Sequence, residues 1–327
     1  ARDVSDLDFA ALTDHDCLDW GGPSLGQAQS KWELIKGLAK KYNEPGKFVT
    51  FPAYEWTSPP ENGGHLNVYY LSDNGQLFSY CDEDSSTSPK LWALLKGLEV
   101  FTAPHHLSWE MGGQNWNFYE GPELEPVAEI YSVWGASEYY RNPKPLMPDP
   151  PYTEPKQGWF YQDALTKGYK FGVIGSGDNH YTKAGSTMIQ FTPHFYPNGL
   201  AGVYAQNLNR EEIFSAIKSR RCYATTSKRI IVDFKIDSHW MGEEYSTTQA
   251  PMVSVLVIGS APLKAVDVVK YEAGSGFSIL HSESTDSERL SFTYKDVGFN
   301  KDSLYYLRVT QEDGEQAWSS PIWVNYQ

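Results

Sequence analysis

The chain changes its pattern near residue 228, and this change limits the folds open to it. Up to about residue 225, short apolar runs alternate with amphipathic segments. "DFAALT" is typical of a buried strand, and "QAQSKWELIKGLAKKY" has helical spacing. After residue 228 the runs are short, of strand type and separated by turn residues. The first part therefore predicts parallel strands wrapped by helices, and the second an antiparallel β-sandwich. We expect domains at residues 1–228 and 229–327.

Charge and hydropathy exclude some classes of partner. The chain has 327 residues and a formal net charge of -14. An acidic surface argues against nucleic acid, because phosphate backbones attract Lys and Arg. A small anionic substrate stays possible, since bound cations reverse the local field. No stretch approaches the length of a transmembrane helix, so we expect no membrane partner. The oligomeric state is left open.

The cysteines and the first residues bear on location. Cys17, Cys81 and Cys222 are widely separated and predict no disulfide framework, so Cys17 is expected to be a buried thiol rather than a soft metal ligand. The opening "ARDVSDLDFAALTDHD" has the character of a helix entering a strand, which predicts that the natural chain starts further upstream. For a soluble protein of this kind, a periplasmic or secreted location is favoured over a cytoplasmic one.

Histidines and carboxylates recur where the predicted strands begin or end. Such residues are Asp14, His15 and Asp16 after "FAALT", Glu55 after "VTFPAY", His65 before "LNVY", His105 and His106 after "VFTAP", and Asp178 and His180 after "FGVI". The carboxyl ends of parallel strands meet on one face, and imidazoles and carboxylates are ligands of divalent metals. Each motif alone is more often a hydrogen-bonded loop; their joint placement favours a metal site. His194, His239 and His281 lack such company and are expected to be surface or structural residues.

Five motifs, taken in order, resemble the PHP (polymerase and histidinol phosphatase) metallohydrolase superfamily: "FAALTDHD", "PAYEW", "GHLNVY", "TAPHH" and "GSGDNH". "RRCYATTSKRI" and "DGEQAWSSPIWV" are similar to a bacterial branch of it with a C-terminal β-domain and long without an assigned function. The resemblance spans nearly the whole chain. It implies an α/β fold: a distorted (β/α)7 barrel of the PHP type, lacking its first strand here, followed by the antiparallel β-sandwich.

The resemblance also implies the site residues. Six match the family's metal ligands: His15, Glu55, His65, His105, Asp178 and His180. His106 is the alternative to His105. The family's initial His-x-His strand is absent from this sequence, so one to three divalent ions, Zn, Mn or Fe, are expected. Asp178 and His180 are expected to be catalytic as well, together with Lys183, which either grips an anionic ester or is a solvated loop lysine.

Several other residues near the motifs have alternative roles that the sequence leaves open. Asp14 is expected to orient His15, Asp16 either does the same or caps a turn, and Asn67 either binds substrate or fixes a strand end. The Pro-rich segment 141–158 predicts a wall or lid. Five tryptophans form either an aromatic wall for an aryl or sugar leaving group or ordinary core packing: Trp20, Trp56, Trp109, Trp116 and Trp134.

These features predict a metal-dependent hydrolase of phosphate monoesters or diesters, in which a metal-bound hydroxide attacks a small anionic ester. A sulfate-ester hydrolase of the arylsulfatase kind on the same site is one alternative. A non-catalytic, metal-stabilised binding protein is the other.

Overall fold

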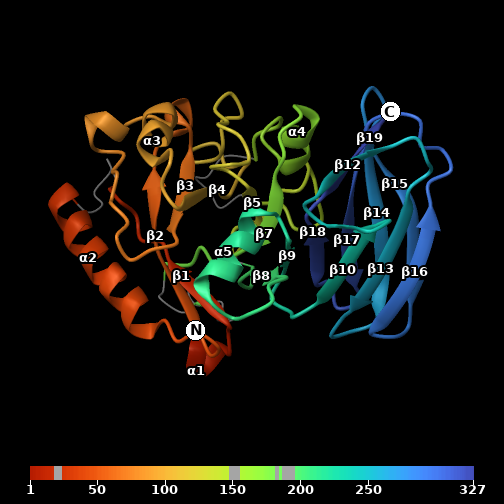
Figure 1. Cartoon of the computed structure of the whole chain (residues 1–327), viewed down its shortest axis with the longest axis horizontal. Helices are drawn as coiled ribbons and strands as arrows, with labels where there is room; N and C mark the ends of the chain where they lie inside the picture. The colour runs from red at the N-terminus through yellow and green to blue at the C-terminus, as the bar shows by residue number, and fades with distance from the viewer. Residues whose placement is uncertain (18–23, 147–154, 181–183, 186–195) are drawn as a thin grey trace.

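The computed structural model has an N-terminal part, in which helices flank short sheets, beside a C-terminal part made of strands (Figure 1). The structure describes residues 1–17, 24–146, 155–180, 184–185 and 196–327. Of the helices in this part of the chain, none combines the length and the apolar character needed to cross a bilayer.

The N-terminal part contains five α-helices among its described residues. They are α1 (Arg2–Ser5), α2 (Leu25–Tyr42), α3 (Ser88–Leu95), α4 (Tyr161–Thr166) and α5 (Arg210–Lys218). Of these, α1 and α2 lie where the sequence analysis expects helical segments. In α2 the Ser24 side chain accepts a hydrogen bond from the Gln27 amide, which caps the helix. Its Trp32 and Ile35 are buried in a core cluster that also contains Tyr54 and Trp56 of strand β2.

The N-terminal strands form two small sheets and the edge of a third. They are β1 (Phe9–Leu12), β2 (Val49–Thr57), β3 (His65–Tyr70), β4 (Val100–Pro104), β5 (Val127–Ser132), β6 (Gly135–Ala136), β7 (Gly172–Gly175), β8 (Leu200–Val203) and β9 (Cys222–Thr225). One sheet has the order β1-β2-β3-β4 and another β6-β5-β7. All nine residues of β2 are buried, and Glu55 is the one charged residue among them.

The prediction of an α/β fold with a distorted (β/α)7 barrel is wrong. A parallel barrel needs each strand to return through a crossover of a dozen or more residues. Here β2 pairs antiparallel with β3, and β3 antiparallel with β4. The connection 58–64 between β2 and β3 holds only a short 3-10 turn, Pro60–Asn62. Within the described ranges the strands fall into four separate sheets rather than one closed barrel.

The C-terminal part contains two sheets that enclose an apolar core. Its strands are β10 (Ile231–Ile236), β11 (His239–Trp240), β12 (Glu244–Thr247), β13 (Met252–Ile258), β14 (Leu263–Glu272), β15 (Gly276–Thr285), β16 (Arg289–Lys295), β17 (Ser303–Gln311), β18 (Gln316–Ser319) and β19 (Ile322–Tyr326). The order β11-β10-β13-β16 is antiparallel throughout. Buried side chains of both sheets, such as Phe234, Val255, Val268 and Leu307, form one cluster.

One sheet crosses the predicted domain boundary at residue 228. Its order is β12-β19-β17-β18-β9-β8, with β14 and β15 joined through β17. Strand β9 lies before the boundary and pairs antiparallel with β18. The two parts are therefore hydrogen-bonded to each other through a continuous sheet, and the division into two domains stays a prediction.

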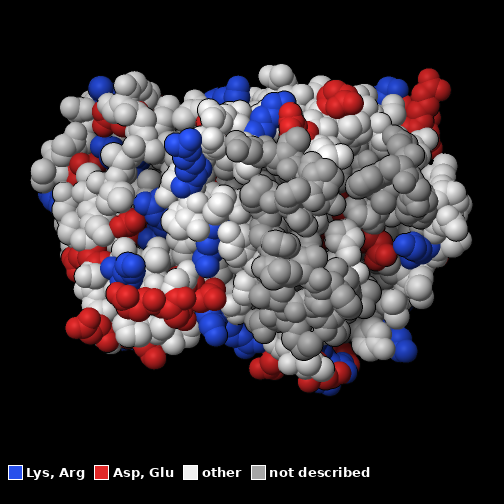
Figure 2. Space-filling view, turned by 180° about the vertical axis from the view of Figure 1, so that it is seen from behind, with Lys and Arg blue, Asp and Glu red and all other residues white. Residues whose placement is uncertain are grey.

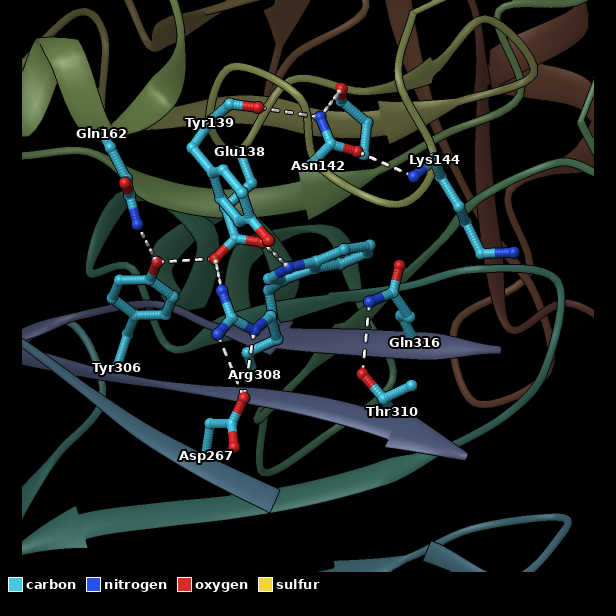
Figure 3. Close-up of polar contacts among 12 residues, drawn as sticks. Glu138, Tyr139, Asn142, Lys144, Gln162, Asp267, Tyr306, Arg308, Thr310 and Gln316 are labelled. Carbon is cyan, nitrogen blue, oxygen red and sulfur yellow. Dashed lines mark hydrogen bonds and ion pairs between the residues drawn. The ribbon is translucent and has the colours of Figure 1, made fainter. Parts of the chain in front are cut away.

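A buried ionic network also joins the two parts (Figure 3). Glu138, in the loop after β6, accepts hydrogen bonds from the Tyr306 hydroxyl at 2.6 Å, the Trp318 indole at 2.8 Å and Arg308 at 3.1 Å. Arg308 also reaches Asp267 at 3.0 Å. Both oxygens of Glu138 thus have partners, and this set is called the Glu138 network below.

Candidate metal centre

Three neighbouring strands bring one glutamate and three histidines to the same end of the first sheet. Glu55 lies in β2, His65 is the first residue of β3, and His105 and His106 directly follow β4. Because β2, β3 and β4 pair antiparallel in this order, the end of β2, the start of β3 and the end of β4 are adjacent. All four side chains are buried.

The ligand atoms of these four residues converge. Glu55 Oε1 lies 2.7 Å from His65 Nδ1 and 3.2 Å from His105 Nε2. One ligand atom from each of Glu55, His65, His105 and His106 lies within 4.8 Å of all the others. We call these four residues the primary cluster.

The primary cluster is rich in polar atoms without hydrogen bonds. Glu55 Oε1, His65 Nδ1, both ring nitrogens of His105 and His106 Nδ1 are buried and lack a hydrogen-bond partner. The short contacts to Glu55 therefore lack hydrogen-bond geometry. Buried polar atoms rarely remain unpartnered, because each costs about 1–3 kcal/mol. A glutamate and three imidazoles directed at one point satisfy their lone pairs by ligating a cation. These groups can hold a metal ion.

The backbone is strained at two positions of the site. His106 has φ 32° and Asp178 has φ 46°, in the left-handed region that side-chain-bearing residues avoid. Such conformations persist where the surrounding structure enforces them, and they gather at functional sites. His106 follows shortly after the end of β4, and Asp178 follows shortly after the end of β7. The left-handed backbone conformation sets the direction in which the two side chains leave the chain after β4 and β7.

Burial and neighbouring charge set the protonation of the cluster. Burial lowers the pKa of His106 well below its usual value, and the nearby His105 and His65 lower it further. Burial also lowers the pKa of His65. Burial raises the pKa of Glu55, but His105 and the other histidines outweigh it and hold that pKa well below its usual value. Burial lowers the pKa of His105 as well, but Glu55 and Asp178 outweigh it and hold that pKa well above its usual value. A cation that binds His105 would therefore compete with a proton.

His15 and His180 lie on the other side of Glu55. His15 Nδ1 is 3.0 Å from Glu55 Oε2, and His15 Nε2 is 3.4 Å from His180 Nε2. A cavity of about 670 Å³ opens here, with Glu55, His15, Asp178 and His180 in its lining. Apolar side chains such as Phe9 and others of β1, β2 and β8 line it as well, together with the basic side chains of Lys31 and Arg229. Glu55 therefore belongs both to the buried cluster and to the cavity wall.

The "TDHD" motif divides among three roles. The Asp14 carboxylate lies 3.5 Å from the Lys31 ammonium group, and both are substantially exposed. Asp16 is buried and accepts backbone hydrogen bonds from Thr57, at 2.9 Å, and from Tyr80. Burial raises the pKa of Asp16 to about 6. Asp16 therefore fixes the connection between β1 and β2, and within this motif only His15 faces Glu55.

The expectation that Cys17 is a free thiol is wrong, because Cys17 and Cys81 form a disulfide. They are separated by 64 residues, with Cα atoms 6.2 Å apart. Sequence separation carried no information on this pair, because the pairing of β1, β2 and β3 brings the two segments together. Cys222 is free and buried.

The tryptophans near the motifs separate into two groups. Trp56 and Trp116 are buried in core clusters. Trp109 and Trp134 are half-buried and stack 6.2 Å apart; Trp109 lies 4.9 Å from the His106 ring and Trp134 lies 6.4 Å from the His180 ring. Trp20 falls outside the described residues. Among the described residues, two tryptophans therefore remain as candidates for the aromatic wall, Trp109 and Trp134.

The remaining sequence candidates lie as follows. Asn67 is buried opposite Glu55 on β3, and its Oδ1 lacks a hydrogen-bond partner. His239 contacts Glu243 at 3.2 Å, and His281 contacts Glu283 at 3.0 Å, both in the C-terminal part. Lys183, His194 and residues 147–154 of the Pro-rich segment fall outside the described residues. In the part of the Pro-rich segment after residue 154, the Lys156 amide donates a hydrogen bond to the carbonyl of Ser108, which lies two residues after His106.

Sequence reasoning missed Glu129 in β5. Its side chain is buried, and with His105 and Asp178 it forms a second group whose ligand atoms all lie within 4.8 Å of one another. The signal was present in "VAEIYSVWG", where one carboxylate interrupts an apolar run. A charge in the middle of a buried strand requires a partner.

Relatives in three Chlamydia species match most of this chain. An uncharacterized protein of Chlamydia pneumoniae is 30% identical over 320 residues, which are 90% of this chain and 49% of that protein. An uncharacterized protein of Chlamydia trachomatis is 28% identical over 351 residues, 99% of this chain and 53% of that protein. The chain spans about half the length of the curated relatives it matches.

Among solved structures, a polysaccharide monooxygenase, CBM33, matches 28% of this chain and 62% of its own, with 14% identity and a TM-score of 0.21. That likeness is too low to bear on fold or function. A family model covers residues 13–113 and 182–254, more than half of the chain, and its first segment contains His15 and the whole primary cluster. The chain belongs to this family, protein of unknown function DUF3604.

Proposed function

We propose that the protein is a metal-dependent hydrolase of phosphate esters. The observation that carries the proposal is the position of Glu55. One of its oxygens converges with three buried imidazoles, and its side chain also lines a cavity of about 670 Å³. A centre with buried ligands beside an open cavity is the arrangement of a catalytic rather than a closed structural site.

The donor set suits the expected metals. Three imidazoles and one carboxylate favour Zn, and they also accept Mn or Fe. A divalent ion supplies an activated water and charge stabilisation at the ester's oxygens. The resemblance of five motifs to PHP enzymes supports the same chemistry through these residues, although the barrel is not found.

The chain's own residues would bind and orient the ester. Asp178 and His180 line the cavity and face it from the end of β7. His180 is placed to move a proton at Nε2, the atom that lies 3.4 Å from His15. Trp109 and Trp134 offer flat apolar surface for the leaving group. Lys183 keeps its expected role of gripping the anion as a prediction from sequence.

The substrate class follows from charge. Cations in the centre favour an anionic group, and a phosphate monoester carries nearly two negative charges near neutral pH. Sulfate esters, with one charge, are the alternative for the same site. On the face seen in Figure 2, the acidic and basic side chains drawn in colour lie interspersed. The formal net charge of -14 supports a small substrate over nucleic acid.

The disulfide supports a location outside the cytoplasm. Disulfides persist in oxidising compartments and are rare in the reducing cytosol. The pairing of Cys17 with Cys81 therefore supports a periplasmic or secreted protein.

The experiment compares turnover of 4-nitrophenyl phosphate and 4-nitrophenyl sulfate by protein loaded with Mn or Zn, with and without chelator. We expect phosphate hydrolysis that chelator abolishes and that Glu55→Gln lowers at least 100-fold. His239→Ala, a histidine remote from the site, should retain activity. A sulfate preference above about tenfold, or about 1.4 kcal/mol, would transfer the proposal to sulfate esters. No turnover of either ester by metal-loaded protein would leave a binding protein.

A further inference from the structure

The cavity beside Glu55 is larger than a phosphate group needs. Its volume is about 670 Å³, and sites for drug-sized ligands typically have about 300–1,000 Å³. Its lining contains the whole of β1 and continues from Leu7 at one end to His15 at the other. An extended strand rises about 3.3 Å per residue, so β1 alone takes the cavity roughly 10 Å away from the candidate metal centre. A phosphate at the ligands would fill only one end.

The walls away from the metal centre are apolar. The lining includes Phe51, Phe101, Ile174 and Ile217, which belong to one core cluster. In the described part of the chain, β1 and β8 are the outermost strands of their sheets, and both line the cavity, so no strand closes the space between them. Water is held poorly against such side chains, and an apolar ligand that covers them binds by the hydrophobic effect.

The far end of the cavity offers no unpaired cation for a second anionic group. Arg229 lines this end, and its guanidinium donates hydrogen bonds to the carbonyls of Ser5, at 3.1 Å, and Asp6. The Asp6 carboxylate lies 3.7 Å from the same guanidinium. The charge of Arg229 is therefore already partnered, and this end favours an uncharged group.

One hydroxyl lies on the apolar wall close to the metal centre. Tyr69 of β3 lines the cavity, and its ring stacks on Phe101 with the centroids 4.9 Å apart. Tyr69 pairs with Ala53, two residues along the strands from the pair of Asn67 with Glu55. No residue among those described forms a hydrogen bond with the Tyr69 hydroxyl. Burial raises the pKa of Tyr69, so the hydroxyl stays protonated and can donate.

We propose that this cavity is the subsite for the alcohol part of the ester, that it selects extended apolar alcohols such as fused-ring aryl alcohols, and that Tyr69 donates a hydrogen bond to the alcohol's oxygen. The subsite rests on the proposed hydrolase function, in which the phosphate lies at the candidate metal centre. Trp134 lies 6.4 Å from the His180 ring, which also lines the cavity. A large leaving group can therefore contact the tryptophan pair and the cavity together.

The first test measures the binding of alcohols to the protein as purified and needs no turnover. The probes are phenol, 2-naphthol and 2-methylnaphthalene, followed by calorimetry or by naphthalene fluorescence. We expect 2-naphthol to bind at least tenfold more tightly than phenol, because its second ring covers more of the apolar wall. Ala201→Phe places a ring in the cavity from β8 and should lower the affinity for 2-naphthol at least tenfold. Ala273→Phe, the same change in the exposed turn between β14 and β15, should leave it unchanged.

The second test isolates the hydroxyl and covers the case in which Ala201→Phe fails to fold. Tyr69→Phe keeps the stacked ring and removes one donor, so the affinity for 2-naphthol should fall about fivefold. The affinity for 2-methylnaphthalene, which has a methyl group in place of the hydroxyl, should not change. Tyr42→Phe, at the exposed end of α2, should alter neither affinity. An equal loss for both probes in Tyr69→Phe would remove the proposed hydrogen bond.

Two results would overturn the subsite: equal affinity for phenol and 2-naphthol, or binding of 2-naphthol that survives in folded Ala201→Phe. The space between β1 and β8 would then belong to another occupant, such as an extended peptide. Hydrolysis of 4-nitrophenyl phosphate by protein that does not bind 2-naphthol would leave the proposed function standing without this subsite. Binding of 2-naphthol as expected, with no ester hydrolysed, would instead remove the proposed function and leave the cavity as a site for apolar alcohols.

Discussion

Two buried ionic clusters in this molecule differ in whether their polar atoms are satisfied. In the Glu138 network, both carboxylate oxygens accept hydrogen bonds, from Tyr306, Trp318 and Arg308 (Figure 3). In the primary cluster, Glu55 Oε1 faces imidazole nitrogens at hydrogen-bond distance but forms no hydrogen bond. The two glutamates are equally buried, at 1% and 4% exposure.

The difference indicates different roles. A buried charge with a full set of donors is stable as it stands and holds its surroundings in one arrangement. A buried group with unsatisfied atoms needs something the polypeptide does not provide, which is a ligand. The Glu138 network thus fixes the two parts of the chain to each other, and the primary cluster has the groups that can hold a cation.

The largest effect is expected from a substitution of Glu138, which tests the comparison most directly. Glu138→Ala leaves Arg308 buried with only Asp267 and should lower the free energy of unfolding by about 3–5 kcal/mol. Urea unfolding measures this loss. Bound metal should stay unchanged, because no ligand is touched. Glu120→Ala, at the exposed pair with Lys96, should change stability by less than about 0.5 kcal/mol. Loss of metal from Glu138→Ala would break the division of roles.

Metal should stabilise the protein through the primary cluster. A ligand at 100 to 1,000 times its Kd adds about 3–4 kcal/mol of stability, so Zn²⁺ or Mn²⁺ should raise the melting temperature of the wild type. Glu55→Gln should abolish this rise, since the amide nitrogen is not a ligand and the carboxylate charge is lost. His239→Ala should melt like the wild type in both conditions. An equal rise in all three proteins would place the metal elsewhere.

Glu125 is an intermediate case between the two clusters. Its Oε2 accepts a hydrogen bond from the Glu120 amide at 2.9 Å, while its Oε1 is buried without a partner. Burial raises the pKa of Glu125 to about 8. A carboxyl whose pKa is raised on folding stabilises the protein fully below its unfolded pKa, and this contribution is lost as pH rises towards 8.

We therefore expect the wild type to lose stability between pH 5 and pH 8 and Glu125→Gln to lose less. The full shift in pKa corresponds to roughly 4–5 kcal/mol, and water entry on ionisation reduces this, so the two proteins should differ by about 2 kcal/mol. Urea unfolding at both pH values gives the difference. Identical pH profiles would show that Glu125 is solvated in the folded state.

The candidate site residues at strand ends could be identified from the sequence. Glu55, His65 and His105 could be found because each follows or begins an apolar run, and ligand chemistry could be inferred from residue type. The helix α2 was also predictable from its helical spacing. These features depend on local order along the chain.

Features that depend on pairing between distant segments were not predictable. The direction of β3 is set by the short connection 58–64, and the alternation of strands and helices around it suggested parallel pairing instead. The Cys17–Cys81 disulfide depends on how β1, β2 and β3 pair with one another. Glu129 looked like one residue of a strand, because its partners lie 24 residues before it and 49 after it in the sequence.

The smallest expected effect concerns Gly112, whose role is steric. The His65 amide donates a hydrogen bond to the Gly112 carbonyl at 2.9 Å. A Cβ at Gly112 would lie 2.7 Å from His65 Nε2 and 2.6 Å from the Trp109 ring, closer than real Cβ contacts allow. Gly112→Ala must therefore displace the His65 ring, whose Nδ1 is the atom directed at Glu55.

The substitution removes none of the candidate ligand residues, but it changes the position of the His65 ring relative to Glu55. We expect a loss of about tenfold in metal affinity, about 1.4 kcal/mol, measured by competition with a chromogenic chelator. Gly37→Ala is the matched control, because a Cβ there meets nothing within 4 Å in the exposed face of α2. That control should bind metal as the wild type does and gain roughly 0.5–1 kcal/mol of stability from helix propensity. Equal metal affinity in the two alanine variants would mean that His65 does not ligate the ion, and the primary cluster would reduce to Glu55, His105 and His106.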